Sequence, residues 1–203
     1  MRRRNKLVDR AIAALADASP AQRLALIRRL TLTLGAPRRS LPRRQIDRVF
    51  AVLARGLRAD PDAAVREAIA YALTFWFERR SPRVLVPVLL DTSEATAVRA
   101  QAAEGIGNVL QCRRLTAVEH ERIAAAMRIG LNDASVEVRF WCLYAVGNLR
   151  MAELRPLVEH RRDTDTSLCP HWWRVCDEAS DALAYWDTGQ WPDLDRRANP
   201  PAA

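Results

Sequence analysis

The residue types that most often bind metals or act in catalysis are scarce in this chain. Its 203 residues include only three histidines and four cysteines. Two histidines follow a glutamate, as Glu119-His120 and Glu159-His160, and such pairs could ligate a metal ion if the fold brought them together. Glu119 lies near the start of its expected helix, however, and Glu159 near the end of its own. The two pairs are therefore out of phase, and we predict no metal site.

The cysteines also lack the spacing of a metal site. Cys169, His171 and Cys176 are close in sequence but match no recognised zinc pattern. If residues 169–187 are helical, the two cysteines share one flank and His171 points away from them. We expect buried, reduced thiols instead. Because the chain also lacks a glycine-rich phosphate loop and a strand-borne nucleophilic serine, we predict no catalytic residue and no cofactor.

Arginine is the one residue type with a functional side chain that clusters in the sequence, and it does so near the N-terminus. The first 60 residues hold 15 basic against 4 acidic residues, a net charge of +11, whereas the remainder carries −3. The predicted anion-binding residues are Arg28, Arg29, Arg38, Arg39, Arg43 and Arg44. Such a block favours an anionic neighbour, which could be nucleic acid, an acidic protein or lipid headgroups. The alternative is a solvated segment with no bound anion.

Aromatic and acidic side chains form a second candidate surface. On helical wheels, the side opposite the apolar face carries Glu67, Tyr71, Glu104, Phe140, Leu143, Tyr144, Asp177 and Asp181. Large apolar groups exposed on such a face usually bind a partner. In the alternative interpretation the wheel is rotated by one residue, and Phe140 packs against the next repeat.

Several of these residues belong to a sequence motif that the chain repeats, here called the repeated phrase. It reads DPDAAVREAIAYAL from residue 60, TAVRAQAAEGIGNVL from residue 96 and DASVEVRFWCLYAVGNL from residue 133. The Val-Arg pairs align at residues 65, 98 and 138, and a weaker copy has Val175 followed by Cys176. A recurrence at this interval is typical of repeat architectures.

Each copy has the pattern of an amphipathic helix with a capped start. In the first copy one apolar face holds Val65, Ala68, Ile69, Ala72, Leu73 and Trp76. Five residues before each repeated valine lies Asp60, Ser93 or Asp133, which we expect to cap the helix N-terminus. Ser19 and Gln22 predict a capping box at an earlier helix.

The repeated phrases resemble the second helix of the HEAT repeat, well over residues 41–187 and by helix pattern alone over 5–34. The resemblance implies an all-α fold, a right-handed α-solenoid of about five helical hairpins. It implies one domain over 1–187, with helix pairs near 5–34, 41–79, 81–111, 116–150 and 151–187, and a flexible tail over 188–203. Second helices would line the concave side. Asp60 with Arg66, and Asp133 with Arg139, would tie neighbouring repeats together.

The fold does not determine the function. Proteins with HEAT-like repeats include scaffolds, transport adaptors, bilin lyases, a metal-dependent hydroxylase and DNA glycosylases. We expect non-catalytic protein binding through the concave face, as a scaffold or adaptor. The alternative is nucleic-acid binding through the basic N-terminal half, with or without glycosylase-like chemistry. Aromatic groups for such a site could come from Trp76, Trp141, Trp172, Trp173 and Trp186.

Location is predicted from the uncharged runs. The longest are near ten residues, as in Phe140 to Leu149, which is too short to cross a bilayer. The basic N-terminus is followed by an uncharged run, Ala11 to Ala16, that is too short for a signal peptide. We therefore expect a cytoplasmic protein without a transmembrane segment.

Overall fold

The computed structural model describes residues 9–192, apart from positions 11, 14, 16–17, 36–41, 76–79 and 111–114. Its helices are α2 (Pro20–Gly35), α3 (Arg43–Ala59), α4 (Ala63–Phe75), α5 (Ser81–Leu90), α6 (Thr96–Leu110), α7 (Ala117–Gly130), α8 (Val136–Leu149), α9 (Arg155–Thr164) and α10 (Val175–Thr188), with a short 3-10 helix η2 (Ala152–Leu154) before α9. In the described part, extended pairing is limited to one isolated bridge, Leu168 with Arg174. The predicted all-α fold is confirmed.

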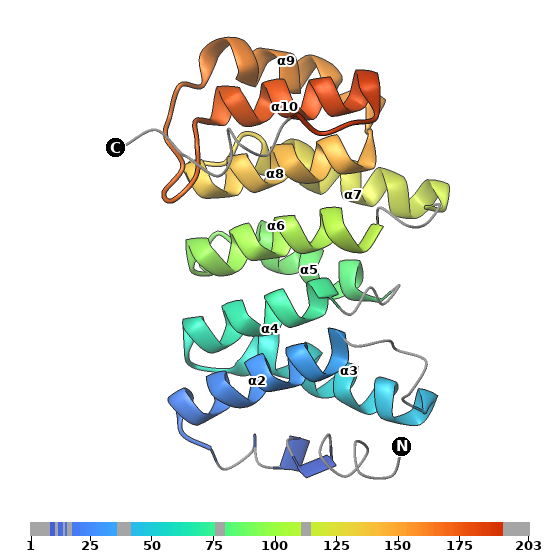
Figure 1. The fold of residues 1–203 in the computed structure, drawn as a ribbon, viewed down its shortest axis with the longest axis vertical. Helices are drawn as coiled ribbons and strands as arrows, with labels where there is room; N and C mark the ends of the chain where they lie inside the picture. Colours follow the sequence, from blue (N-terminus) through green and yellow to red (C-terminus); the bar gives the residue numbers. More distant parts are fainter. Residues whose placement is uncertain are drawn as a thin grey trace.

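The helices alternate between two sets along the chain. Helices α2, α4, α6, α8 and α10, here called the B helices, stack one on the next along the long axis (Figure 1). Helices α3, α5, α7 and α9, the A helices, each pack against the B helix that follows. Helices α4, α6 and α8 each pack between two other B helices, which is the solenoid arrangement predicted from the repeats. No described helix is both long enough and apolar enough to cross a membrane.

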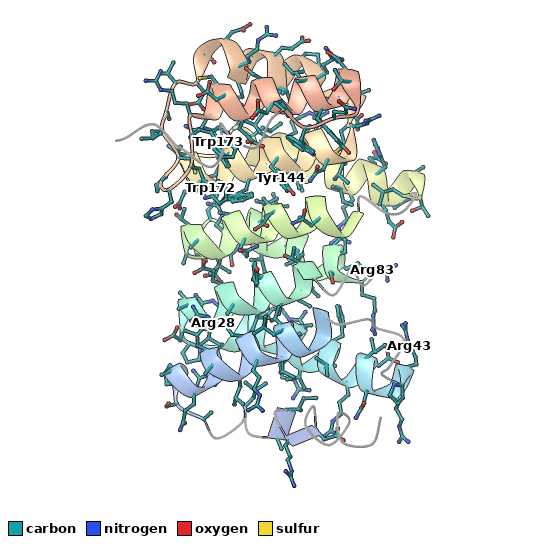
Figure 2. All side chains as sticks on the ribbon, in the orientation of Figure 1. Arg28, Arg43, Arg83, Tyr144, Trp172 and Trp173 are labelled. Atoms are coloured by element: carbon teal, nitrogen blue, oxygen red, sulfur yellow. The ribbon has the colours of Figure 1, made fainter. Side chains whose placement is uncertain are left out.

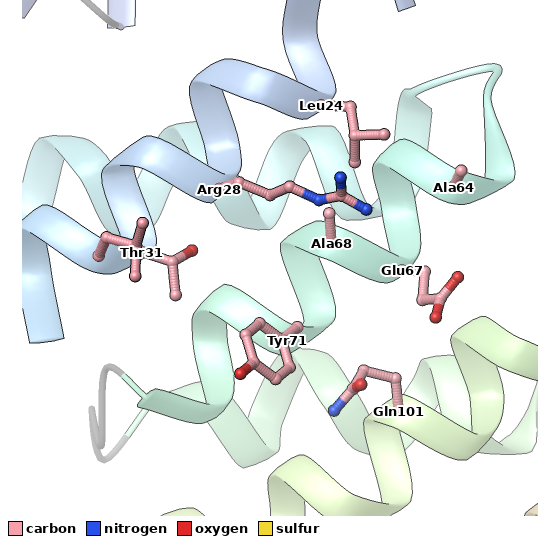
Figure 3. A pocket seen from close by; sticks show the side chains of 9 residues that line it. Leu24, Arg28, Thr31, Ala64, Glu67, Ala68, Tyr71 and Gln101 are labelled. Atoms are coloured by element: carbon pink, nitrogen blue, oxygen red, sulfur yellow. The ribbon is translucent and has the colours of Figure 1, made fainter. Parts of the chain in front are cut away.

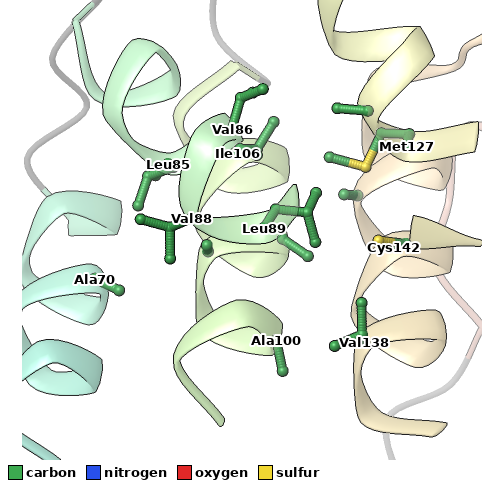
Figure 4. Packing of buried hydrophobic residues seen from close by; sticks show 14 of the residues in the cluster. Ala70, Leu85, Val86, Val88, Leu89, Ala100, Ile106, Met127, Val138 and Cys142 are labelled. Carbon is green, nitrogen blue, oxygen red and sulfur yellow. The ribbon is translucent and has the colours of Figure 1, made fainter. Parts of the chain in front are cut away.

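The core follows the repeated phrase. The repeated valines, Val65, Val98, Val138 and Val175, are each at most 1% exposed. Figure 4 shows aliphatic side chains of α5 and α6, among them Leu89 and Ile106, beside Met127 and Val138 of the next pair. Because each repeat buries its apolar face only against the adjacent one, the core is continuous from α2 to α10.

Small residues let neighbouring B helices approach closely. A Cβ atom on Gly107 of α6 would lie 2.8 Å from the Cα of Ala145 in α8. A Cβ on Gly147 of α8 would lie 2.8 Å from the Cβ of Ala182 in α10. The two glycines therefore allow a backbone-to-backbone contact that any larger residue would separate.

The capping residues were predicted only in part. Ser19 and Gln22 form the expected capping box, because each backbone amide donates to the other residue's side chain. The N-caps expected at Asp60 and Asp133 are wrong by two residues. Asp62 accepts from the Val65 amide and Ser135 from the Val138 amide, so these residues cap α4 and α8. Asp60 and Asp133 each accept the amide two residues later instead, which makes a turn before the cap.

Asp60 and Asp133 also take part in a ladder of ion pairs between repeats. Arg23 donates to both oxygens of Asp60 at 2.7 and 2.9 Å, and Arg66 to both oxygens of Glu94 at 2.7 Å. Arg99 pairs with Asp133 in the same way. We call these contacts, together with the Arg139–Asp165 pair below, the arginine ladder.

The expected pairing of Asp60 with Arg66, and of Asp133 with Arg139, is thus offset by one repeat. Each aspartate side chain takes the arginine of the preceding B helix. Arg66 and Arg139 reach their own aspartates only through the backbone carbonyls, at 2.6 and 2.8 Å. Arg139 then donates to both oxygens of Asp165, at 2.7 and 3.3 Å. Each of these two arginines therefore bridges its own turn to the next repeat, which the aspartate-to-arginine spacing alone does not reveal.

Candidate binding face of the B helices

Two repeated positions of helices α4, α6 and α8 are at least partly exposed to solvent. They lie three and six residues after the repeated valine. We call this surface the B face, and its residues are Ala68, Tyr71, Gln101, Glu104, Trp141 and Tyr144, with Arg28 of α2. On α10 the same positions hold Glu178 and Asp181, and both are buried. The B face is therefore open from α2 to α8 and closed at α10.

Two of the residues expected to contact a partner lie in the core. Phe140 is 1% exposed and Leu143 is 0% exposed, so their expected exposure is wrong. The Phe140 ring contacts Trp141 and Trp173 with centroids 5.5 Å apart, and Trp172 at 6.1 Å. The alternative interpretation, in which the helical wheel is rotated by one residue, is the correct one. A shift of one residue turns a helix position by about 100°, which moves Phe140 from the solvent side to the core.

The other predicted contact residues lie at different depths. Tyr71 is 44% exposed, whereas Glu67, Glu104, Tyr144 and Asp177 are half-buried. Asp181 is only 4% exposed, so its expected exposure is also wrong.

A strip of aromatic rings crosses the upper part of the B face. We call Trp141, Tyr144, Trp172, Tyr185 and Trp191 the aromatic strip. Trp141 meets Trp172 at 5.1 Å and Tyr144 at 5.5 Å between ring centroids, both edge to face. Trp191 stacks on Tyr185 at 4.6 Å and on Tyr144 at 5.6 Å. Edge-to-face and stacked contacts at these distances are favourable, so the rings support one another.

Four separate segments supply this strip, and Tyr185 comes from α10 itself. Trp141 and Tyr144 come from α8, Trp172 from the turn before α10, and Trp191 from the residues after it (Figure 2 labels Tyr144 and Trp172). Trp191 falls in the segment that the sequence assigned to a tail, and positions 193–203 lie outside the described residues. The partial exposure of Trp172, 38%, leaves the strip open at its edge.

A tight hairpin, rather than the start of a helix, positions Trp172. The Cys169 amide donates to the Trp173 carbonyl at 3.1 Å, and the Trp172 amide donates to the Cys169 carbonyl at 3.0 Å. His171 has φ of 64°, a left-handed conformation that turns the chain sharply. The hairpin therefore directs Trp172 against Trp141, and α10 begins only at Val175.

The candidate metal-type residues are engaged in other contacts. Glu119 completes a capping box with Thr116 at the start of α7, and His120 contacts Glu153. Glu159 pairs with Arg155. Burial raises the pKa of the Cys169 thiol to about 12, so this thiol stays protonated at neutral pH. Among the described residues, no three ligand-type side chains are grouped as a metal site would need.

A polar cluster lies beside the aromatic strip, centred on Glu104 of α6. Gln101 donates to one carboxylate oxygen at 2.6 Å and Asn108 to the other at 3.2 Å. The Tyr144 hydroxyl donates to the Asn108 side chain at 2.8 Å, which links the cluster to the strip. Burial raises the pKa of Glu104, although the amide hydrogen bonds act in the opposite direction.

A groove of about 530 Å³ continues the B face towards the N-terminus (Figure 3). It is lined by Leu24, Arg28, Thr31, Leu32, Ala64, Glu67, Ala68, Tyr71 and Gln101. The groove is open at Ala64 and Ala68, because these side chains are too short to fill the space between α2 and α4. Gln101 belongs to both the groove and the Glu104 cluster, so the two features adjoin.

The structure does not gather the predicted anion-binding arginines. Arg28 lies at the groove, whereas Arg43 lies at the opposite side of the molecule (Figure 2). Arg43 pairs with Asp47 at 3.3 Å, and Arg44 is exposed close by. Arg29 is exposed on α2, and Arg38 and Arg39 lie outside the described residues. A common anion-binding surface made from this set stays a prediction.

Sequence reasoning missed several residues that the structure brings into the ladder and the B face. Arg23 could have been found, because it follows Asp17 by six residues just as Arg66 follows Asp60. Gln101 and Asn108 could also have been found, because they lie three residues before and four residues after Glu104 on one helix, where side chains meet. Only the contact of Asn108 with Tyr144 depends on how α6 packs against α8, which the sequence pattern does not specify.

No protein-family model matches this chain, and no curated protein matches it. Solved structures with similar folds do exist. The complex of CpcE and CpcF of phycocyanin lyase from Nostoc sp. PCC7120 matches with a TM-score of 0.60 and 15% identity, over 87% of this chain and 97% of that chain.

Two designed proteins also match. A designed armadillo repeat protein in complex with the peptide (KR)4 matches with a TM-score of 0.56 and 18% identity, over 87% of this chain and 80% of that chain. A computationally designed armadillo repeat protein for modular peptide recognition matches with a TM-score of 0.51 and 18% identity, over 86% and 79% of the two chains. At these identities the likeness concerns the fold, so the chain is a helical-repeat solenoid.

Proposed function

We propose that this chain is a HEAT-like protein-binding scaffold or adaptor that contacts its partner through the B face. The observation that carries the proposal is the aromatic strip. Its rings pack against one another, yet Trp172 stays partly exposed. Rigid, half-buried aromatic groups lose little conformational entropy on binding and are enriched at interface hot spots. The proposed contact residues also include Glu67, Tyr71, Glu104 and Tyr144.

The architecture supports the same proposal. Stacked helices present a long surface whose side chains vary from repeat to repeat, while the ladder and core stay unchanged. Two structurally similar proteins are described as a subunit complex and as a peptide complex, which is consistent with a binding role. We further propose a cytoplasmic location, with which the free, buried thiols of Cys142 and Cys169 agree.

The test compares two surface variants in quantitative co-purification from cells that produce the chain. Trp172→Ala removes the most open ring of the strip, so we expect it to weaken partner capture by about 2 kcal/mol or more, the hot-spot scale. Ile129→Ala removes an apolar side chain of the A helix α7 that is more exposed than Trp172, and it should leave capture unchanged. Both variants should keep the far-ultraviolet circular dichroism of the parent chain. Equal capture by the parent and by Trp172→Ala would remove the proposal.

A further inference from the structure

We propose that the partner of the B face presents a basic peptide segment, with one arginine or lysine side chain seated on the Glu104 carboxylate beside Tyr144. This inference rests on the proposed function and names the chemistry of the partner.

The Glu104 carboxylate differs from the carboxylates of the arginine ladder in the groups that it accepts from. In the arginine ladder, Asp60, Glu94, Asp133 and Asp165 each receive a guanidinium. Glu104 receives one side-chain amide on each oxygen and no cation. A carboxylate has about four acceptor positions, so roughly half of the acceptor capacity of Glu104 stays available to solvent.

This geometry restricts what can cover Glu104. A partner that displaces water from a carboxylate must replace the lost hydrogen bonds, because a buried charge without a counter-charge is strongly unfavourable. A guanidinium or ammonium group supplies both the donors and the charge. An apolar or acidic partner supplies neither, so it would weaken binding at this position.

The neighbouring rings also suit a cation. Tyr144 is tied to the cluster through Asn108, and Trp141 packs against Tyr144 with 5.5 Å between ring centroids. The faces of tyrosine and tryptophan attract cationic groups that come within about 6 Å of the ring centre. A basic side chain that enters from solvent would therefore meet a carboxylate and aromatic rings together.

The charge of the B helices points the same way, although the whole chain is basic with a net charge of +8. Helices α4, α6 and α8 contain one basic residue each, Arg66, Arg99 and Arg139, and α10 contains none. All three arginines are occupied by the ladder. The same four helices carry the acids Glu67, Glu104, Glu137, Asp177, Glu178, Asp181 and Asp187. Glu178 and Asp181 are buried and Asp187 pairs with Arg155, so the acids that reach the B face are Glu67 at the groove and Glu104. Because the arginines of these helices are held in the ladder, the B face of α4 and α6 carries negative charge, which complements a basic segment and disfavours a phosphate backbone.

The experiment measures fluorescence anisotropy of labelled ten-residue peptides titrated with the full chain at low salt. One peptide alternates arginine with alanine, and two matched peptides replace arginine by glutamine or by glutamate. We expect the arginine peptide to bind well above the other two. Because the chain has a net positive charge, non-specific attraction would favour the glutamate peptide instead.

Two variants with the same change of charge locate the binding site. Glu104→Gln should lower affinity for the arginine peptide by about tenfold or more, as expected for loss of a charged contact. Glu121→Gln, on the exposed side of the A helix α7, should change it by less than about twofold. Equal losses in both variants, or no preference for the arginine peptide, would overturn the inference.

The two proposals fail in different ways. If Trp172→Ala abolishes partner capture while Glu104→Gln changes neither capture nor peptide binding, the B face is an interface without the cation seat. If neither variant affects capture, the proposed function is wrong as well. Tighter binding of duplex DNA or RNA than of the arginine peptide in the same titration would overturn the basic-partner chemistry.

Discussion

At the scale of single residues, the structure separates two kinds of carboxylate by their partners. Hydrogen bonds from Arg66 hold the pKa of Glu94 below its usual range. Burial alone would raise the pKa of Asp133 and Asp165, but the hydrogen bonds and charges of Arg99 and Arg139 lower both. In Glu104, which has no arginine, burial prevails and its pKa is raised. The ladder carboxylates join neighbouring repeats, whereas burial of Glu104 is opposed by hydrogen bonds from neutral amides alone.

The pKa shifts predict acid sensitivity. A carboxylate whose pKa is lower in the folded state binds fewer protons there than in the unfolded state, so its stabilisation is present at neutral pH and is lost as pH falls through the folded pKa. Urea unfolding at about pH 7 and about pH 3 should show this loss in the parent chain, with contributions from Glu94, Asp133 and Asp165.

Asp133→Asn isolates one rung of the ladder. It leaves Arg99 buried without its carboxylate, so we expect a loss of about 3 kcal/mol in the free energy of unfolding at neutral pH. The variant should lose less than the parent on acidification, because one depressed pKa is gone. Glu121→Gln, an exposed change on α7, is the control and should behave like the parent. A parallel acid loss in Asp133→Asn and parent would contradict this account.

At the scale of helices, close approach of α6 and α8 determines which side chains reach the B face. The contact of Gly107 with Ala145 brings the two helices together, and Asn108 can then meet the Tyr144 hydroxyl. The hairpin before α10 adds Trp172 from the other side. Helix packing therefore positions the B-face side chains, and this packing depends on buried residues such as Gly107 and Ala145.

Gly107→Ala tests this packing. The added methyl would meet the backbone Cα of Ala145 at 2.8 Å, which cannot move without shifting α8. We expect a loss of about 1–3 kcal/mol, even though alanine has the higher helix propensity. Gly56→Ala is the matched control, because its methyl meets only the mobile end of Ile69. Chemical denaturation of both variants would decide, and a Gly107→Ala protein as stable as Gly56→Ala would refute the close contact.

At the scale of the whole molecule, the chain behaves as a line of units that contact only their neighbours. The ladder crosses each boundary once, and the B-helix contacts run continuously from α2 to α10. A break at one boundary should therefore weaken both sides, since each new end exposes a face that was core.

Cutting the chain after Leu110 makes such a break. It separates Arg99 from Asp133 and exposes the face of α6 that packs on α8. We expect the fragment of residues 1–110 to melt broadly and at a markedly lower temperature than the full chain, as measured by circular dichroism. A C-terminal piece that melts cooperatively near the full-length temperature would instead indicate two independent domains.

The sequence by itself determined the repeat and the class of fold. The Val-Arg phrases, the helical period and the Ser19–Gln22 capping box are local patterns, and local patterns decide where helices form and which valines are buried. The solenoid, the buried Val65 and Val138, and the solvent-facing Tyr71 were all predictable from them.

Only the tertiary structure decided which residues form the site. Phe140 and Trp141 are adjacent in sequence, and the rotation of α8 against α6 and α10 places the first in the core and leaves the second half-exposed. The partner of Asp60 is Arg23, 37 residues earlier, because stacking brings one repeat's turn beside the preceding helix. Stacking also decides that no arginine of a neighbouring helix reaches the Glu104 carboxylate, whose hydrogen bonds come from Gln101 and Asn108 of its own helix. Such pairings depend on how helices pack in space, and a helical period cannot specify that packing.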